Sequence, residues 1–274
     1  MIAALNIEYG NKGRGLRRII NRIKRDRITV ELRKARGVCL VYVTYTSYNG
    51  KINLDKLSGV LGSQSRRILC DSRIKFPKNS GFIRFESDSF RIRLCTNMAC
   101  QILKNSDGVS ISLGIYDPKG IISDFLPVSL EYCRRVTVVT NESKIYQTQL
   151  NRALDELGAT AVITSKADEL ENCNLIIAPD VIDASLSIKG SAIVLTTQKP
   201  TKPISGHIYY KYIFKMPASL AQIKPDVLSD EYFCSALYTI ENKYELGSIV
   251  PDLCSDGTTS QTIPSIQKFL SEQP

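Results

Sequence analysis

Residues 109–120 read Val109-Ser-Ile-Ser-Leu-Gly-Ile-Tyr116 and then Asp117-Pro-Lys-Gly120. The first eight residues are mostly β-branched or apolar, which is typical of a strand, and the last four carry a turn signal. Residues 121–133 follow with apolar side chains at helical spacing. A strand, a tight turn and a helix in this order predict the start of a parallel α/β sheet.

The same pattern continues to residue 197. Short apolar runs predict further strands at residues 135–140, 160–164, 174–178 and 191–196. A helix is predicted over 144–157, with Gly158 placed to end it in the left-handed conformation. Runs without polar alternation are typical of strands buried on both faces, whereas an antiparallel α+β sheet would alternate. We therefore predict five parallel strands in the order 3-2-1-4-5, with the turn at Asp117 at the switch point.

The order and spacing of these elements resemble the Rossmann-like NAD(P)-binding domain superfamily, of the shikimate and amino-acid dehydrogenase type. The resemblance covers about 90 residues, from 109 to 197. It implies the fold and a crevice at the carboxyl ends of the strands, where NAD(P) is the cofactor that the family binds. The turn lacks the family's Gly-x-Gly-x-x-Gly motif: Gly114 and Gly120 flank it, but Tyr116, Asp117 and Pro118 stand where the family has small residues.

Two interpretations of this turn follow. In one, Asp117-Pro-Lys-Gly120 is an ordinary turn and the Asp117 side chain caps a helix. In the other, the crevice still binds a nucleotide or a small metabolite, because open α/β sheets bind ligands there for geometric reasons. Lys119 would then contact an anion. The candidate residues of this crevice are Asp117, Lys119, Gly120, Thr140, Asn141 and Asp180.

The chain before this region is strongly basic. Residues 1–108 carry 22 Lys and Arg against 8 Asp and Glu, whereas the rest carries 14 against 19, which together give the net charge of +9. We predict a basic α/β domain over 1–108 and a Rossmann-like domain with a C-terminal extension over 109–274. In the first domain we expect strands at residues 2–9, 37–46 and 81–86, and helices at 15–27, 54–61 and 87–103. In the extension we expect a strand at residues 206–216 and helices at 226–242 and 263–270.

The predicted helix over 15–27 has an apolar stripe and a basic remainder. Leu16, Ile19 and Ile23 follow helical spacing. Such a face suits a nucleic acid, an anionic membrane surface or an acidic partner, and it also fits a solvated surface that balances the acidic second domain. The candidate anion-binding residues are Arg14, Arg17, Arg18, Arg22 and Arg25.

The remaining composition argues against common catalytic sites. The chain has eight cysteines without a Cys-x-x-Cys pair and a single histidine, His207, so we expect no metal site. Without an export signal we expect free thiols and a cytoplasmic location. No Walker loop or Gly-x-Ser-x-Gly motif occurs. The leading hypothesis is a non-catalytic protein that binds a ligand or a partner. The alternatives are an NAD(P)-dependent oxidoreductase with an atypical phosphate-binding loop and a nucleic-acid-binding protein.

Overall fold

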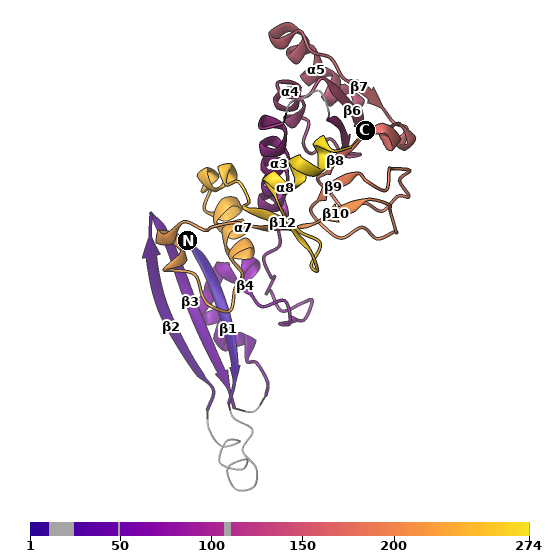
Figure 1. Ribbon diagram of the computed structural model, residues 1–274. Coiled ribbons are helices and arrows are strands. Elements are labelled where there is room, and N and C mark those ends of the chain that lie inside the picture. The colour runs from indigo at the N-terminus through magenta and orange to yellow at the C-terminus, as the bar shows by residue number, and fades with distance from the viewer. Residues whose placement is uncertain (11–24, 49, 107–110, 274) are drawn as a thin grey trace. The chain divides into compact units, whose positions relative to one another are not determined.

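The computed structural model describes residues 1–10, 25–48, 50–106 and 111–273 (Figure 1). Contacts divide the chain into two compact units, each made of two separate segments. The first is Met1–Phe90 with Met216–Leu246, and the second is Arg91–Lys215 with Gly247–Pro274. The division into folding domains at 105–108 stays a prediction. Within the described residues, no helix is long and apolar enough to cross a membrane.

The second unit is built on a six-stranded sheet in the order β7-β6-β5-β8-β9-β10, and every neighbouring pair is parallel. The strands are β5 (Ser112–Tyr116), β6 (Arg135–Val139), β7 (Val162–Thr164), β8 (Leu175–Ala178), β9 (Ile193–Thr196) and β10 (His207–Tyr209). Numbered along the chain, this order is 3-2-1-4-5-6, which is the order of the Rossmann fold. The predicted α/β class, parallel pairing and order of the first five strands are therefore confirmed.

Three helices connect these strands as the sequence indicates: α4 (Phe125–Leu130), α5 (Ser143–Leu157) and the 3-10 helix η2 (Ala167–Asn172). Two more helices flank them in the chain, α3 (Ser89–Lys104) before β5 and α8 (Ile263–Ser271) after β13 (Ser260–Thr262). Gly158 ends α5 with a φ of 64°, and its N–H donates to the carbonyl of Leu154 at 3.0 Å, as predicted. The predicted helix over 121–133 is shorter than expected, because residues 121–124 form turns before α4 begins.

Gly114 has a packing role in β5. A Cβ atom at this position would lie 2.7 Å from Cδ2 of Leu170 and 3.2 Å from Cys173. Both neighbours are buried in the hydrophobic core beneath η2. This glycine therefore lets η2 and the segment after it approach the sheet closely, rather than serving the turn that follows β5.

The prediction of one continuous strand over 206–216 is wrong. The segment divides at Tyr210 into β10 and β11 (Lys211–Ile213), which belong to different sheets. The strand β11 pairs antiparallel with β12 (Leu253–Ser255), which pairs with β13 (Ser260–Thr262). The carbonyl of Ser255 accepts from the N–H of Tyr210 at 3.1 Å, so the chain is held where it passes between the two sheets.

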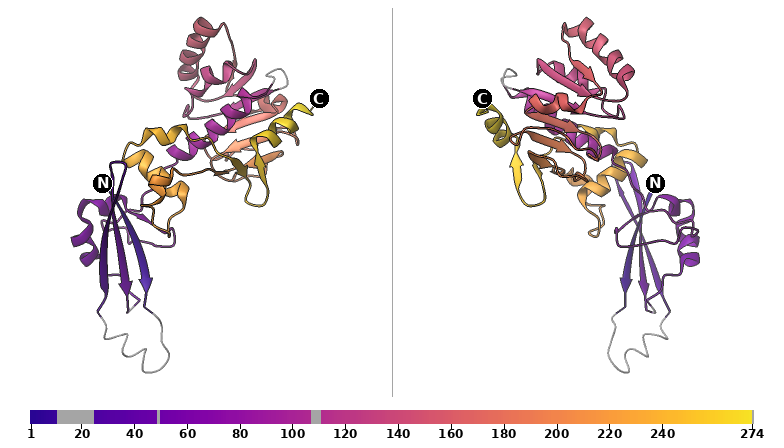
Figure 2. Two further views of the ribbon diagram at one scale, coloured as in Figure 1. Left: turned by 60° about the vertical axis from the view of Figure 1, so that its left-hand side comes forward. Right: turned by 90° about the vertical axis from the view of Figure 1, so that its right-hand side faces the viewer.

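The first unit contains a four-stranded sheet in the order β2-β3-β1-β4, whose three long strands lie side by side in Figure 2. Its strands are β1 (Ile2–Tyr9), β2 (Arg27–Ala35), β3 (Val38–Ser47) and β4 (Leu69–Cys70). Its helices are α2 (Leu54–Leu61), η1 (Gly62–Arg67), α6 (Ala218–Ala221), α7 (Asp230–Ile240) and the first three residues of η3 (Tyr244–Ser248). Buried side chains from α2 pack with those of β1 and β3 into one core.

Two expectations for this unit need correction and one falls outside the described residues. The strand expected at 81–86 is wrong, because this segment makes only a single bridge, between Arg84 and Ile68. The expected helix over 226–242 is shorter and runs over α7 alone. Most of the expected helix over 15–27 lies outside the described residues, but Arg27 is the first residue of β2, a strand that the sequence analysis missed.

Candidate functional site

A crevice of about 390 Å³ lies at the carboxyl ends of β5, β6, β7 and β8. The strand order reverses between the neighbouring strands β5 and β8, and ligands of open α/β sheets bind at such points. Its polar lining residues are Tyr116, Lys119, Thr140, Asn141, Ser165, Asp180 and Asp183. Four of the six candidate residues, Lys119, Thr140, Asn141 and Asp180, are thus brought together.

Asp117 lies beneath the turn after β5 and is fully buried, at 0% exposure. Its Oδ2 atom accepts two hydrogen bonds of 2.8 Å, one from the N–H of Ile122 and one from the hydroxyl of Tyr146. Its own N–H donates to the carbonyl of Val139 at 2.9 Å and ties the turn to the end of β6. The carboxyl group therefore organises the turn from inside, and it does not line the crevice.

The side-chain partner of this carboxyl group is Tyr146, which comes from α5. Burial, followed by the charge of Asp117 and the hydrogen bond to it, raises the pKa of Tyr146 far above its usual value of 10. The hydroxyl therefore stays protonated and acts as a donor. The contact joins the first turn of the domain to the second helix, 29 residues along the chain.

One ion pair of the crevice joins two neighbouring loops. Lys119, after β5, forms an ion pair with Asp180, after β8. Desolvation alone would raise the pKa of Asp180, but the hydrogen bonds from Lys119 and from the N–H of Val181 outweigh it and hold this pKa below its usual value. The hydrogen bond to Asp180 raises the pKa of Lys119. Lys119 is thus already neutralised, while the exposed Asp183 adds a negative charge to the rim.

Backbone hydrogen bonds fix the loop after β6. Thr140 donates its N–H to the carbonyl of Thr164 at 2.9 Å, and its Oγ1 accepts from the N–H of Glu142 at 3.0 Å. The N–H of Asn141 donates to the carbonyl of Pro118 at 3.2 Å, which joins this loop to the turn after β5. Gly120 has a φ of 68°, a conformation that favours glycine, and it lies outside the lining of the crevice.

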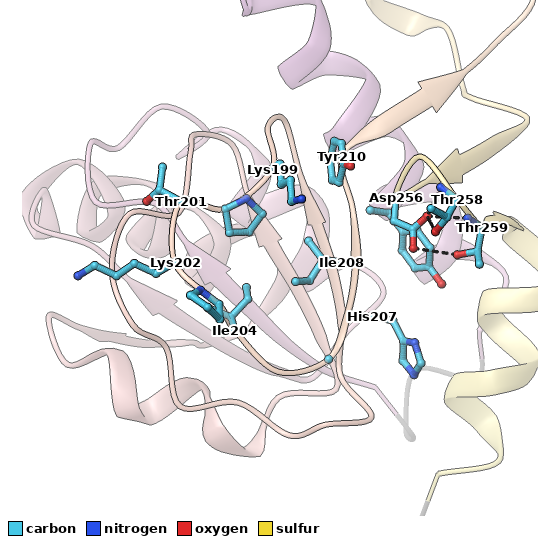
Figure 3. A pocket seen from close by; sticks show the side chains of 14 residues that line it. Lys199, Thr201, Lys202, Ile204, His207, Ile208, Tyr210, Asp256, Thr258 and Thr259 are labelled. Atoms are coloured by element: carbon cyan, nitrogen blue, oxygen red, sulfur yellow. Dashed lines mark hydrogen bonds between the residues drawn. The ribbon is translucent and has the colours of Figure 1, made fainter.

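A second, more open cavity of about 630 Å³, which no pattern in the sequence indicates, lies beside β10 (Figure 3). Figure 3 shows Asp256 hydrogen-bonded to Thr258 and Thr259. The N–H groups of these threonines donate to Asp256 Oδ1 at 2.7 and 2.6 Å, and the bonds hold the pKa of Asp256 well below its usual value. This carboxylate therefore stabilises the turn between β12 and β13.

His207, the single histidine, also lines this cavity. Its ring packs edge-on against Phe269 of α8, with 5.1 Å between the ring centroids. In the part of the chain that the structure describes, no three His, Cys, Asp or Glu side chains are grouped as a metal ion would require. The geometry thus gives His207 a packing contact.

The candidate anion-binding arginines are mostly outside the described residues. Of the five, only Arg25 is described, and it lies exposed just before β2. Arg14, Arg17, Arg18 and Arg22 fall within the undescribed segment 11–24. Their proposed role therefore stays a prediction from sequence.

Comparison with known proteins gives distant structural likenesses only. No family model matches the chain, and no curated protein matches it. Quinate dehydrogenase from Corynebacterium glutamicum in complex with NAD is 8% identical over 99% of both chains, with a TM-score of 0.32. L-tryptophan dehydrogenase from Nostoc punctiforme is 10% identical over 98% of this chain and 79% of its own, with a TM-score of 0.33.

A third structure, the iminosuccinate reductase of Paracoccus denitrificans in complex with NAD+, is 15% identical and has a TM-score of 0.29. The match covers 40% of this chain and only 37% of that protein, well under half its length. At such TM-scores the likeness carries no argument about activity. The Rossmann-like fold of the second unit follows from its own strand order.

Proposed function

We propose that this protein binds a small polar ligand without phosphate groups in the crevice at the carboxyl ends of β5 to β8, and that it does so without catalysis. The observation that carries this proposal is the place of Asp117. In a dinucleotide-binding domain, backbone N–H groups at the start of the helix after the first strand bind the pyrophosphate. Here the buried carboxyl group of Asp117 accepts from the N–H of Ile122, in the turns between β5 and α4. That donor is therefore not offered to a ligand.

The charges of the crevice support the same ligand class. Its one lysine, Lys119, is paired with Asp180, and Asp183 remains as an acidic group on the rim. An anionic ligand would need a cation that is not already neutralised, whereas a neutral or cationic ligand would not. The hydroxyl of Ser165 and the amide of Asn141 offer hydrogen bonds to such a ligand.

The size of the crevice suits a ligand of nucleoside size or smaller. Its volume of about 390 Å³ falls at the lower end of small-molecule sites, which span roughly 300–1,000 Å³. The Tyr116 side chain is mostly buried in the wall and offers a flat apolar surface. We therefore expect nucleosides, amino sugars and small amines to be the best first probes.

A thermal-shift series tests the proposal. Nucleosides, amino sugars, small amines and the four nicotinamide dinucleotides are compared on the wild type and on Asn141→Ala, with Asn151→Ala on α5 as the matched control. A ligand at a hundredfold excess over its Kd stabilises by about 2.7 kcal/mol. We expect stabilisation by a phosphate-free compound that Asn141→Ala weakens and Asn151→Ala leaves unchanged. Stabilisation by a dinucleotide alone would favour the oxidoreductase alternative instead.

The cysteines support the proposed cytoplasmic location. All eight are free thiols, and six of them are buried. Free thiols persist in reducing compartments, whereas disulfides form in oxidising ones. We therefore include a reducing, cytoplasmic environment in the proposal.

A further inference from the structure

The edge strand β2 presents an apolar row to solvent. It is nine residues long and ends the sheet order of the first unit, so that it pairs with β3 on one side only. Val30 is 51% exposed and Leu32 is 55% exposed on one face of this strand. No described residue pairs with its outer edge. Unpaired N–H and C=O groups along the edge of a sheet can template the addition of another strand.

The hairpin between β2 and β3 determines which backbone groups point outward. Arg36 and Gly37 form its two-residue turn with φ values of 47° and 74°, and Ala35 pairs with Val38. A two-residue turn closes on a hydrogen-bonded pair, and the bonding then alternates along the strand. The N–H and C=O groups that point to the open edge therefore belong to Lys34, Leu32, Val30 and Ile28. The exposed apolar side chains and the outward backbone groups belong to the same residues.

The charges on the other face of β2 are self-complementary. Glu31 and Arg33 lie two residues apart and form a two-pronged ion pair within the strand, with N···O distances of 2.9 and 2.8 Å. In an antiparallel pair of identical strands centred on Leu32, Glu31 of each copy lies opposite Arg33 of the other. These would be non-hydrogen-bonded pairs, in which facing side chains come closest. The centre would bring the two Leu32 side chains together.

We propose that two copies of this chain associate through β2, antiparallel and centred on Leu32, to extend the sheet across a two-fold axis. Val30, Leu32 and Lys34 of each copy then exchange N–H···O=C hydrogen bonds with the other copy. The charge pattern excludes most other registers. Centring on Glu31 sets two glutamates opposite each other, centring on Arg33 sets two arginines opposite each other, and centring on Val30 sets Arg27 opposite Arg33. Like charges directly opposite destabilise a strand pair.

The register centred on Thr29 is also charge-complementary, because it sets Arg27 opposite Glu31. It pairs a shorter part of β2, since the strand begins at Arg27, only two residues before the centre. The register centred on Leu32 pairs the strand from Thr29 to Ala35. It therefore buries more of the open edge while keeping Glu31 opposite Arg33.

Sedimentation velocity on the full chain tests this proposal. We expect the wild type to dimerise reversibly as its concentration rises from about 1 to about 100 µM, a range that brackets a Kd in the micromolar region. Leu32→Lys places a charge at the centre of the interface and should abolish the dimer. Leu154→Lys on α5 is the matched control, because Leu154 is 54% exposed and lies in the second unit. It should dimerise as the wild type does.

A charge exchange tests the register. Glu31→Arg sets two arginines opposite each other at both symmetry-related positions and should raise the dimer Kd roughly tenfold. The double variant Glu31→Arg with Arg33→Glu restores opposite charges across the two-fold axis and should return the Kd to near the wild-type value. Circular dichroism confirms that each variant is folded. A monomeric wild type across this range, or a Leu32→Lys variant that still dimerises, would overturn the proposal. A double variant that stays as weak as Glu31→Arg would overturn the register.

Discussion

Replacing Asp117 by alanine tests whether its carboxyl group organises the turn after β5. The change removes the acceptor of the Ile122 N–H and of the Tyr146 hydroxyl, both of which bond Asp117 at 2.8 Å in buried surroundings. Asp117→Asn is the matched control, because its amide oxygen still accepts from both donors. The amide nitrogen would take the position of Oδ1, a buried atom that has no hydrogen-bond partner in the structure.

The expected loss follows from these two contacts. Leaving a buried donor without an acceptor costs about 1–3 kcal/mol. Two such donors give an expected loss of about 2–6 kcal/mol for Asp117→Ala, which reaches the range of strongly destabilising substitutions. Asp117→Asn keeps the acceptor but brings a buried amide N–H group to the unpartnered Oδ1 position, so it should cost about 1–3 kcal/mol, less than Asp117→Ala. Tyr146→Phe removes one of the two bonds and should also cost less than Asp117→Ala.

Urea unfolding followed by far-ultraviolet circular dichroism measures these losses. The free energies of unfolding of Asp117→Ala, Tyr146→Phe and the double variant form a cycle whose coupling energy we expect at about 0.5–3 kcal/mol. A loss below about 1 kcal/mol for Asp117→Ala would refute the reasoning. So would a coupling energy near zero, since the two groups would then act independently.

Three further predictions address pH, backbone conformation and charge. Because burial raises the pKa of Tyr146 above its usual 10, the unfolded chain releases this proton first, so stability should fall as pH rises above about 10, and Tyr146→Phe should reduce the fall in alkaline urea titrations. Gly158→Ala should cost about 1 kcal/mol of stability in urea unfolding, since Gly158 has a φ of 64° with open space around it, whereas Gly190→Ala should be neutral. Nucleic-acid binding, measured by fluorescence anisotropy, should weaken with salt by a log–log slope of about −0.9 per phosphate contact, and a salt-independent signal would count against it. That slope should become flatter when glutamine replaces Arg17, Arg18, Arg22 and Arg25.

The parallel sheet could be predicted because its evidence is local. The run that forms β8 is buried on both faces, and the run that forms β6 is buried at Val136, Val138 and Val139; such runs occur in parallel sheets. The crevice residues followed from the same logic, because turns after neighbouring parallel strands meet at one edge. Lys119 and Asp180 were expected there on this ground, and both line the crevice.

The contacts that determine the charge of the crevice and the conformation of the turn beside it join residues far apart in the sequence. The ion pair of Lys119 and Asp180 joins residues 61 apart, and the bond from Tyr146 to Asp117 depends on how α5 packs against the sheet. No periodicity in the sequence indicates such partners. The strand β2 was missed for a different reason. Most of its residues are exposed on both faces, so its apolar residues stand among charges and resemble a basic surface.

Titration calorimetry of the wild-type chain with NADH and NADPH tests the central claim most directly. If Asp117 occupies the donor that a pyrophosphate would need, neither dinucleotide should give a binding heat at concentrations up to about 1 mM, which corresponds to a binding free energy weaker than about −4 kcal/mol. A one-to-one complex with a Kd of about 10 µM or lower would contradict the account.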